Sequence, residues 1–283
     1  MKLSAQAFRD LPNKSFTLLG MSGVGKTYLS QMLSDANWYH YSGDYRIGTH
    51  YLKDEMQENL RKQAMSVPFL KDLLLTDSIT IENKITIDHL KPISSFLGKL
   101  GNPELGGLPL AEYKRRQDLH RVSEIQAMKE VPEFIARSRA AGYDHFINDA
   151  GGSLCEMDDA EMLAVLEENT ILLYLEATPD EEQVLIERAA AAPKPMYHRA
   201  EYLDEQLSLY MDERKLEYVA LIDPNDFVRW MFPRLFKSRL PRYRGLAERY
   251  GYTVSTTELH QVKNEVEFLE LIENVIQAQG GDS

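Results

Sequence analysis

Short apolar runs alternate with longer amphipathic stretches along this chain. Each apolar run is long enough for one β-strand, and in the longer stretches apolar residues recur at helical spacing. The predicted strands are residues 16–19, 38–41, 145–148, 171–175 and 252–254. The predicted helices are residues 26–35, 157–168, 180–192, 202–216, 241–250 and 265–277. This alternation is typical of an α/β fold in which helices cover both faces of a mostly parallel sheet.

The interval between the second and third predicted strands is much longer than a simple crossover requires. We therefore expect a core made of residues 1–49 and 142–283, with residues 50–141 forming an inserted, largely helical subdomain. Inside this insert, apolar and β-branched residues at 78–81 and 85–87 predict a β-hairpin.

The composition is that of a folded protein, because 43% of the 283 residues are hydrophobic and 10% are aromatic, which excludes a disordered chain. The single cysteine, Cys155, excludes an internal disulfide, and no apolar run reaches the roughly 20 residues of a membrane-spanning helix. The N-terminal residues also lack the hydrophobic region of a signal peptide. We therefore expect a cytoplasmic protein without a membrane partner.

The charge balance is acidic, with 44 Asp and Glu against 32 Lys and Arg and a net charge of −12. This balance argues against broad electrostatic binding of nucleic acid. Residues 229–244 are an exception, with six basic residues, no acidic one and interleaved aromatics. They predict either an amphipathic helix with buried aromatics and one or two functional arginines, or an anion site for a charged substrate or RNA.

Residues 20–27, Gly-Met-Ser-Gly-Val-Gly-Lys-Thr, match the pattern G-x-x-x-x-G-K-[ST] between a predicted strand and a predicted helix. Glycines let successive N–H groups point at phosphate oxygens, at the positive end of the following helix. Lys26 is expected to bridge the β- and γ-phosphates, and Thr27 to hold Mg²⁺ through its hydroxyl. The predicted nucleotide-binding residues in this segment are Gly20, Ser22, Gly23, Val24, Gly25, Lys26, Thr27 and Tyr28. The pattern leaves the reaction open, because this fold hosts kinases, switches and motors.

Polar residues follow the second and third predicted strands, at the edge where ligands bind in open α/β sheets. Asp44 is suited to accept a proton from an acceptor hydroxyl or to hold Mg²⁺ through water, and Arg46 to bind an anion. The alternative is a helix cap beside a surface arginine. Asp149 ends the third strand, where a second magnesium residue is expected, and Gly151 and Gly152 permit close approach of a ligand to the backbone.

Further cations for a nucleotide are expected near the end of the alanine-rich helix. Arg188 precedes the segment 194–199, and Arg199 ends it. Such a segment could form a lid whose cations close over the phosphates. An exposed loop that is merely basic explains the same residues equally well.

In order along the chain, these pieces resemble the shikimate kinase group of small-molecule kinases within the P-loop NTPase superfamily. The segments that carry the resemblance are Gly20–Thr27, Ser42–Asp44, Arg121–Glu124, Asp149–Gly152, Lys194–Tyr197 and Arg239–Tyr243. Within the predicted core the resemblance extends over residues 14–48 and 143–254, and apart from Arg121 it leaves the insert unmatched.

The resemblance implies a three-layer P-loop NTPase fold and phosphotransfer from ATP with Mg²⁺. Carried over to this chain, it makes Asp44 the contact to the acceptor hydroxyl and the candidate base. It makes Arg239 and Arg121 clamps on an acceptor anion, and it places Gly151 and Gly152 along the acceptor pocket.

The function expected from these observations is ATP- and Mg²⁺-dependent transfer of a phosphoryl group to a hydroxyl of a small anionic acceptor. Since Ser42, Ala150 and Lys194 stand where the family pattern has Asp, Gly and Arg, the acceptor is expected to differ from shikimate. The alternative is an ATP- or GTP-controlled switch or adaptor whose insert binds a protein. A third hypothesis is a kinase for RNA or a nucleotide-linked acceptor that binds through residues 229–244.

Overall fold

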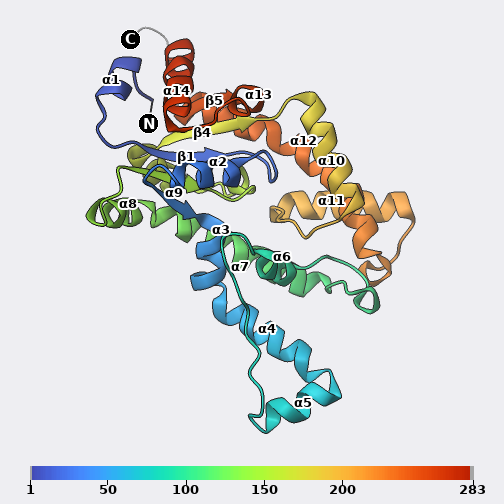
Figure 1. Ribbon diagram of the computed structural model, residues 1–283. Coiled ribbons are helices and arrows are strands. Elements are labelled where there is room, and N and C mark those ends of the chain that lie inside the picture. The colour runs from blue at the N-terminus through green and yellow to red at the C-terminus, as the bar shows by residue number, and fades with distance from the viewer. Residues whose placement is uncertain (1, 281–283) are drawn as a thin grey trace. The chain divides into compact units, whose positions relative to one another are not determined.

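The computed structural model describes residues 2–280, and Figure 1 shows its helices and strands. The strands are β1 (Ser15–Leu19), β2 (Trp38–Ser42), β3 (His145–Asp149), β4 (Ile171–Glu176) and β5 (Gly251–Ser255). The α-helices are α1 (Ala5–Asp10), α2 (Lys26–Ser34), α3 (Gly43–Arg46), α4 (Lys53–Met65), α5 (Pro68–Leu75), α6 (Lys91–Leu97), α7 (Leu110–Lys129), α8 (Val131–Ala140), α9 (Ala160–Asn169), α10 (Pro179–Ala191), α11 (Ala200–Arg214), α12 (Pro224–Tyr250), α13 (Thr256–Leu259) and α14 (Glu265–Gln279). The short turns of other helical types are η1 (Ile47–Tyr51), η2 (Pro103–Leu105), η3 (Leu154–Glu156) and η4 (Val219–Leu221).

Within residues 2–280, five strands form one sheet in the order β2-β3-β1-β4-β5, and every pairing is parallel. All five strands predicted from apolar runs are confirmed, each longer by one or two residues. The residues of β4 from Ile171 to Leu175 are all buried, as expected for a parallel strand covered on both faces. The parallel order brings the carboxyl ends of β1, β2 and β3 to one edge, where residues 20–27, called the phosphate loop below, follow β1.

Helices cover both faces of the sheet, which gives three layers (Figure 1). On one face the stacked rings of Phe16 and Trp38, with centroids 5.7 Å apart, pack against Phe268 of α14. On the other face Tyr41 packs against Phe134 of α8, with ring centroids 4.7 Å apart. Burial of such rings removes a large apolar area from water. The structure therefore has the predicted α/β fold, with helices on both faces of a parallel sheet.

The chain divides into two compact units. The first consists of the described residues up to Gly43, residues Glu124–Pro193 and the described residues from Arg229 onward. The second consists of Asp44–Ser123 and Lys194–Val228. This second unit contains residues 50–123 of the expected insert. It also contains residues 194–228, which the strand and helix pattern did not indicate as part of it.

The two segments of the second unit are joined by backbone and side-chain bonds. The Asn102 backbone N–H donates to the Ile222 carbonyl at 2.8 Å, and Lys114 pairs with Asp204 at 2.5 Å. Backbone bonds between segments distant in sequence satisfy groups that burial would otherwise leave unpaired. Residues 194–228 are therefore an integral part of this unit.

The predicted hairpin at 78–81 and 85–87 is wrong. This region contains no strand, and its backbone bridge, within the described residues, joins Thr86 to His89. The Gln57 amide on α4 instead donates to the Ile81 carbonyl and accepts from the Asn83 N–H. A side-chain amide thus supplies the donor and acceptor that a second strand would have supplied.

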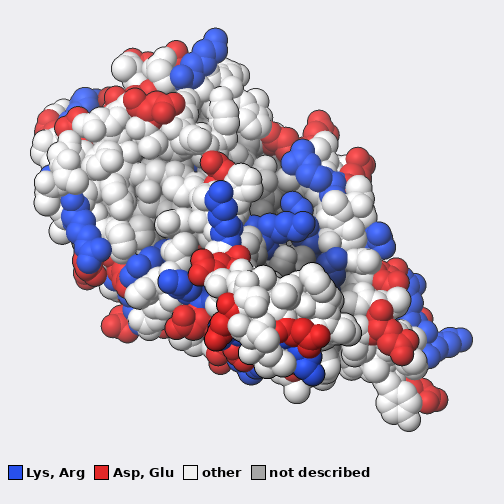
Figure 2. Space-filling model, turned by 60° about the horizontal axis from the view of Figure 1, so that its bottom comes forward, with Lys and Arg blue, Asp and Glu red and all other residues white. Residues whose placement is uncertain are grey.

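Figure 2 shows Lys and Arg side chains interspersed with Asp and Glu on the face drawn, despite the net charge of −12. Among the described residues, no helix is both long enough and apolar enough to cross a membrane.

Candidate functional site

The phosphate loop connects β1 to α2 in the first unit. Gly23 and Gly25 have φ of +95° and +99°, a backbone conformation that residues with a Cβ rarely adopt. Gly25 is the N-cap of α2 and has no side chain to bond the first helical N–H groups. The start of α2 therefore presents backbone N–H groups and the positive end of its dipole, a combination suited to an anion.

Lys26, the first residue of α2, folds back over this loop. Its side chain is buried, and Nζ donates to the Gly20 carbonyl at 2.8 Å and to the Met21 carbonyl at 3.2 Å. Carbonyl oxygens carry partial negative charge, so they hold the ammonium where phosphate oxygens are expected. The predicted position of Lys26 at the phosphate loop is thus explained by the local chain geometry.

Thr27 and Asp149 meet at the carboxyl edge of the sheet. Thr27 Oγ1 donates to Asp149 Oδ2 at 2.6 Å, and Asp149 is 8% exposed. A hydroxyl and a carboxylate are the hard oxygen ligands that Mg²⁺ takes when it also keeps waters and nucleotide oxygens. The pair therefore fits the predicted magnesium site. Within the described residues, no group of three or more His, Cys, Asp or Glu is arranged to hold a metal by itself.

The glycine segment after β3 lies directly against the phosphate loop. A Cβ on Gly152 would come within 2.9 Å of the Ser22 backbone nitrogen, closer than such atoms approach. The Gly152 carbonyl accepts two hydrogen bonds from α12, from Arg239 Nη1 at 2.7 Å and from the Tyr243 hydroxyl at 2.9 Å. These contacts set the distance between the segment and the phosphate loop.

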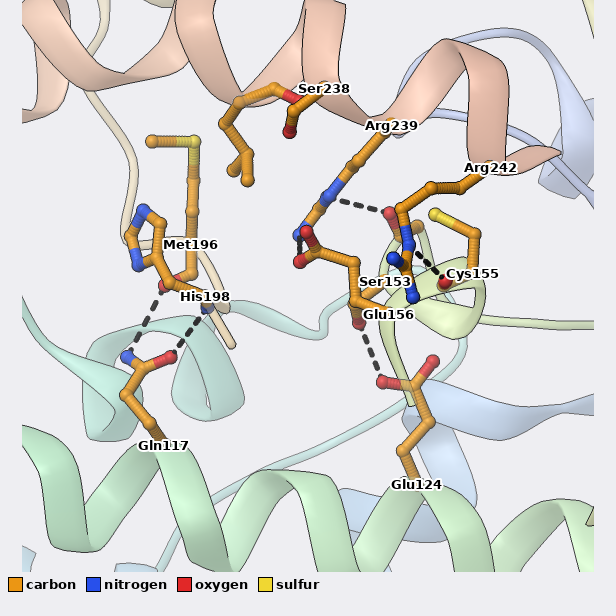
Figure 3. Close-up of polar contacts among 12 residues, drawn as sticks. Gln117, Glu124, Ser153, Cys155, Glu156, Met196, His198, Ser238, Arg239 and Arg242 are labelled. Atoms are coloured by element: carbon orange, nitrogen blue, oxygen red, sulfur yellow. Dashed lines mark hydrogen bonds and ion pairs between the residues drawn. The ribbon is translucent and has the colours of Figure 1, made fainter. Parts of the chain in front are cut away.

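A buried cluster of charged side chains that includes Arg239 lies beside this segment (Figure 3). Arg239 Nη2 lies 2.8 Å from Glu156 Oε2, and the two side chains are 6% and 0% exposed. Burial alone lowers the pKa of Arg239, but the neighbouring Glu156 carboxylate raises it above its usual value. Ser153 Oγ donates to Glu124 Oε2 at 2.6 Å in the same cluster. Arg239 thus bonds a carboxylate of its own chain, and its predicted contact with an acceptor anion stays a prediction.

A thiol and a phenol lie beside this ion pair. Burial raises the pKa of the Cys155 thiol to about 12 and raises the pKa of Tyr243 well above its usual value. A thiol with so high a pKa is a poor nucleophile at neutral pH. Cys155 therefore has the properties of a buried structural residue.

A pocket of about 350 Å³ opens beside the phosphate loop. It is lined by Gly23, Val24, Ala177, Asp180, Glu181, Val184, Leu185, Arg188, Thr256 and His260. Gly23, Val24 and Arg188 were predicted to bind nucleotide, and the structure brings them together here. Tyr28, also predicted, is 75% exposed on the first turn of α2 and does not line this pocket.

The sequence did not reveal the part of this pocket formed by Glu181, Thr256 and His260. Glu181 accepts hydrogen bonds from Thr178 and Thr256, and its Oε1 lies 3.3 Å from His260 Nδ1. Burial raises the pKa of Glu181, but these hydrogen bonds outweigh it and lower the pKa overall. The capping pattern Thr178–Glu181 was visible in the sequence. The approach of Thr256 and His260, which follow β5, to Glu181 was not.

The second unit contains the remaining predicted site residues. Asp44 and Arg46 lie in α3, and the Arg46 guanidinium lies 5.6 Å from the centre of the Tyr51 ring. Arg121 is on α7, and Arg199 is the N-cap residue of α11. Asp44 immediately follows Gly43, which belongs to the first unit and lies beside the end of β3.

The segment 194–199, predicted as a lid, is fastened to α7 within the second unit. The Gln117 amide donates to the Met196 carbonyl at 3.3 Å and accepts from the His198 N–H at 2.9 Å (Figure 3). The Tyr113 hydroxyl bonds His198 Nδ1 at 2.9 Å. These bonds give the segment a defined conformation in this structure.

The basic stretch 229–244 lies within α12, and several of its arginines bond groups of the first unit. The partners of Arg229, Arg234, Arg239, Arg242 and Arg244 are respectively the Ala190 carbonyl, the Trp230 carbonyl, Glu156, Asp158 and Glu176. Paired arginines scattered around a helix do not form the continuous basic track that nucleic acid requires. The amphipathic-helix interpretation therefore fits this stretch better.

No model of a known protein family matches the sequence, and no curated protein matches it. Among solved structures, the shikimate kinase from Acinetobacter baumannii, in complex with shikimate, is similar with a TM-score of 0.39 and 17% identity, over 97% of this chain and 96% of that one. A shikimate kinase from Bacteroides thetaiotaomicron is similar with a TM-score of 0.36 and 15% identity, over 94% of this chain and 98% of that one. Shikimate kinases, the group whose motifs the sequence resembles, are thus among the solved structures to which this chain is similar.

Proposed function

We propose that this chain is an ATP- and Mg²⁺-dependent phosphotransferase that acts on a hydroxyl of a small anionic acceptor. The observation that carries the proposal is the 2.6 Å bond between Thr27 and Asp149, beside the phosphate loop that Lys26 closes. Phosphoryl transfer needs mainly positioning and charge neutralisation, and these three residues are suited to provide both.

The proposed roles follow from the chemistry of each side chain. Lys26 and the N–H groups at the start of α2 bind the β- and γ-phosphates, and Thr27 and Asp149 hold Mg²⁺. Mg²⁺ held by these two side chains would neutralise charge that develops on the phosphate oxygens. Asp44 takes the proton of the acceptor hydroxyl as its oxygen forms a bond to the γ-phosphorus and the bond to the bridging β,γ-oxygen breaks.

Other residues are proposed to bind the two substrates. The pocket beside Gly23 and Arg188 is suited to a nucleoside, because it is largely apolar yet contains several polar side chains. Arg199 is proposed as a second cation for the phosphates. Arg46, Arg121, Arg239 and the Gly151–Gly152 segment are proposed for the acceptor.

The experiment is mass spectrometry of a metabolite extract incubated with Mg²⁺ and ATP, or with Mg²⁺ and GTP. Wild-type protein is compared with Lys26→Ala and with Lys62→Ala, a control at an exposed lysine of α4. A new phosphorylated species with the wild type and the control, but not with Lys26→Ala, supports the proposal and names the acceptor. If Asp44→Ala then forms this product at an unchanged rate, the proposed role of Asp44 is wrong.

The second candidate function is a nucleotide-controlled switch or adaptor, and helix α5 favours it. No residue of this helix is buried, and Phe69 and Leu75 are 73% and 64% exposed. Exposed apolar helices of this kind often contact another protein. A partner that binds wild-type protein but not Lys26→Ala, together with no phosphorylated product in any extract, would favour this function over the kinase.

A further inference from the structure

His40 is a buried histidine on β2 that no role described above uses. Its side chain is 7% exposed, and Nε2 lies 3.9 Å from Asp149 Oδ2. Nε2 is buried and has no hydrogen-bond partner within residues 2–280. Buried polar atoms are nearly always paired, because leaving one unpaired costs its hydration. A buried ring nitrogen this close to a carboxylate is placed to donate a hydrogen bond to it.

The sheet register explains why the two side chains face each other. β2 and β3 are parallel, with His40 beside Ile147 and Ser42 beside Asp149. Residues two apart on a strand project from the same face, so His40 shares a face with Ser42. Asp149 is the neighbour of Ser42 on β3, and His40 and Asp149 therefore lie on one face of the sheet. The 3.9 Å between His40 Nε2 and Asp149 Oδ2 is about 1 Å longer than a hydrogen bond. A small turn of the carboxylate is enough to close it.

We propose that His40 is a positioning residue for the metal-binding carboxylate: its Nε2–H donates a hydrogen bond to Asp149 when Mg²⁺ and nucleotide are bound. This inference rests on the proposed function, which makes Asp149 and Thr27 the metal residues. Carboxylates that bind metals are themselves held by hydrogen bonds from outer residues, and loss of such a residue weakens metal binding. Thr27 is the partner in the present structure, and a second donor fixes the carboxylate once the Thr27 hydroxyl binds the ion.

The first test counts bound Mn²⁺ by electron paramagnetic resonance, with a non-hydrolysable ATP analogue present and no acceptor. His40→Phe keeps a ring but removes the N–H, whereas His40→Gln keeps an N–H near the position of Nε2. We expect His40→Phe to weaken Mn²⁺ binding about 10- to 100-fold and His40→Gln to restore most of the affinity. Unchanged binding in His40→Phe, or an equal loss in both variants, overturns the inference.

The second test is read on wild-type protein, and a variant serves only to assign the His40 resonance. Nitrogen NMR of ¹⁵N-histidine-labelled protein, with His40→Gln for assignment, reports which ring nitrogen carries the proton. We expect a proton on Nε2 whose resonance moves downfield when Mg²⁺ and the ATP analogue are added. A proton on Nδ1 alone in the bound state overturns the inference. So does strong coupling of the His40 nitrogen to Mn²⁺ in the electron paramagnetic resonance experiment, which is the sign of direct ligation.

The two proposals fail in different ways. If wild-type protein binds neither Mn²⁺ nor the ATP analogue, the proposed function is wrong, and the role of His40 is wrong with it. If wild-type protein binds both and the His40 variants bind equally well, only the role of His40 is wrong.

Discussion

Gly152 and Ser22 are in backbone contact, although 130 positions of sequence separate them: a Cβ on Gly152 would lie 2.9 Å from the Ser22 nitrogen. The segment after β3 and the phosphate loop after β1 therefore form one packed structure. Their spacing is set from the other side by the bonds from Arg239 and Tyr243 to the Gly152 carbonyl.

Replacing Gly152 by alanine is expected to push the phosphate loop out of position. Overpacking of this kind costs roughly 1–3 kcal/mol, and we expect part of it to appear as weaker nucleotide binding in calorimetric titrations. Gly245→Ala is the matched control, because a Cβ there meets no atom within 4 Å and should stabilise α12 by about 0.5–1 kcal/mol. Wild-type nucleotide affinity in Gly152→Ala would contradict the importance of the contact.

Replacing Thr27 by valine is expected to weaken the metal site while leaving the shape of the side chain almost unchanged. Loss of a residue that only hydrogen-bonds a metal ligand weakens metal binding roughly 10- to 100-fold. We expect the Mg²⁺ concentration that gives half-maximal ATP turnover to rise by at least this factor. Thr27→Ser retains the hydroxyl and should behave like the wild type. The same Mg²⁺ dependence in both variants would show that the hydroxyl does not contact the ion.

Arg239→Met is expected to destabilise the first unit, because it leaves the Glu156 carboxylate buried without its cation. The expected loss in the free energy of unfolding is about 3–5 kcal/mol, measured by urea denaturation. Arg137→Ala removes a pair with Glu133 in which both side chains are more than half exposed, and should cost about 0–1 kcal/mol. The double variant Arg239→Met, Glu156→Met removes both charges and should lose less stability than Arg239→Met alone; an equal or larger loss would contradict this account.

Glu112 is expected to make the second unit sensitive to acid. Hydrogen bonds from Arg115, and then from Arg116, lower the pKa of Glu112 from 4.5 to about 2. Because the folded pKa lies below the unfolded one, this stabilisation is fully present above pH 4.5 and is lost as the pH falls toward 2. Urea unfolding of wild type and Glu112→Gln should therefore differ at pH 6 and converge near pH 2. A constant difference across this range would contradict the assignment.

Much of the first unit could be predicted from the sequence because its determinants are local. Five buried strands are visible as apolar runs, and the phosphate loop is visible as a motif between a strand and a helix. The meeting of Thr27 with Asp149 also follows from sequence, since parallel strands place their carboxyl ends at one edge. For these residues, neighbours in sequence determine the position in space.

Other features depend on contacts between distant residues, and no local pattern reveals them. Glu156 was not predicted as the partner of Arg239, because 83 residues separate them. His40 lies in an apolar run and gives no sign of its neighbour on β3; the only signal is its spacing of two residues from Ser42. The failed hairpin shows the same limit, because the Gln57 side chain on α4 satisfies backbone groups that the local sequence had assigned to a strand.

The two bonds between the Gln117 amide and the backbone at Met196 and His198 matter for any attempt to exchange modules between proteins. A chimera that replaced only residues 50–141 would remove Gln117 and leave the segment from Lys194 to Val228 without its support. The transplantable module consists of both segments of the second unit, Asp44–Ser123 and Lys194–Val228. Grafting must therefore join the host chain at four points instead of two.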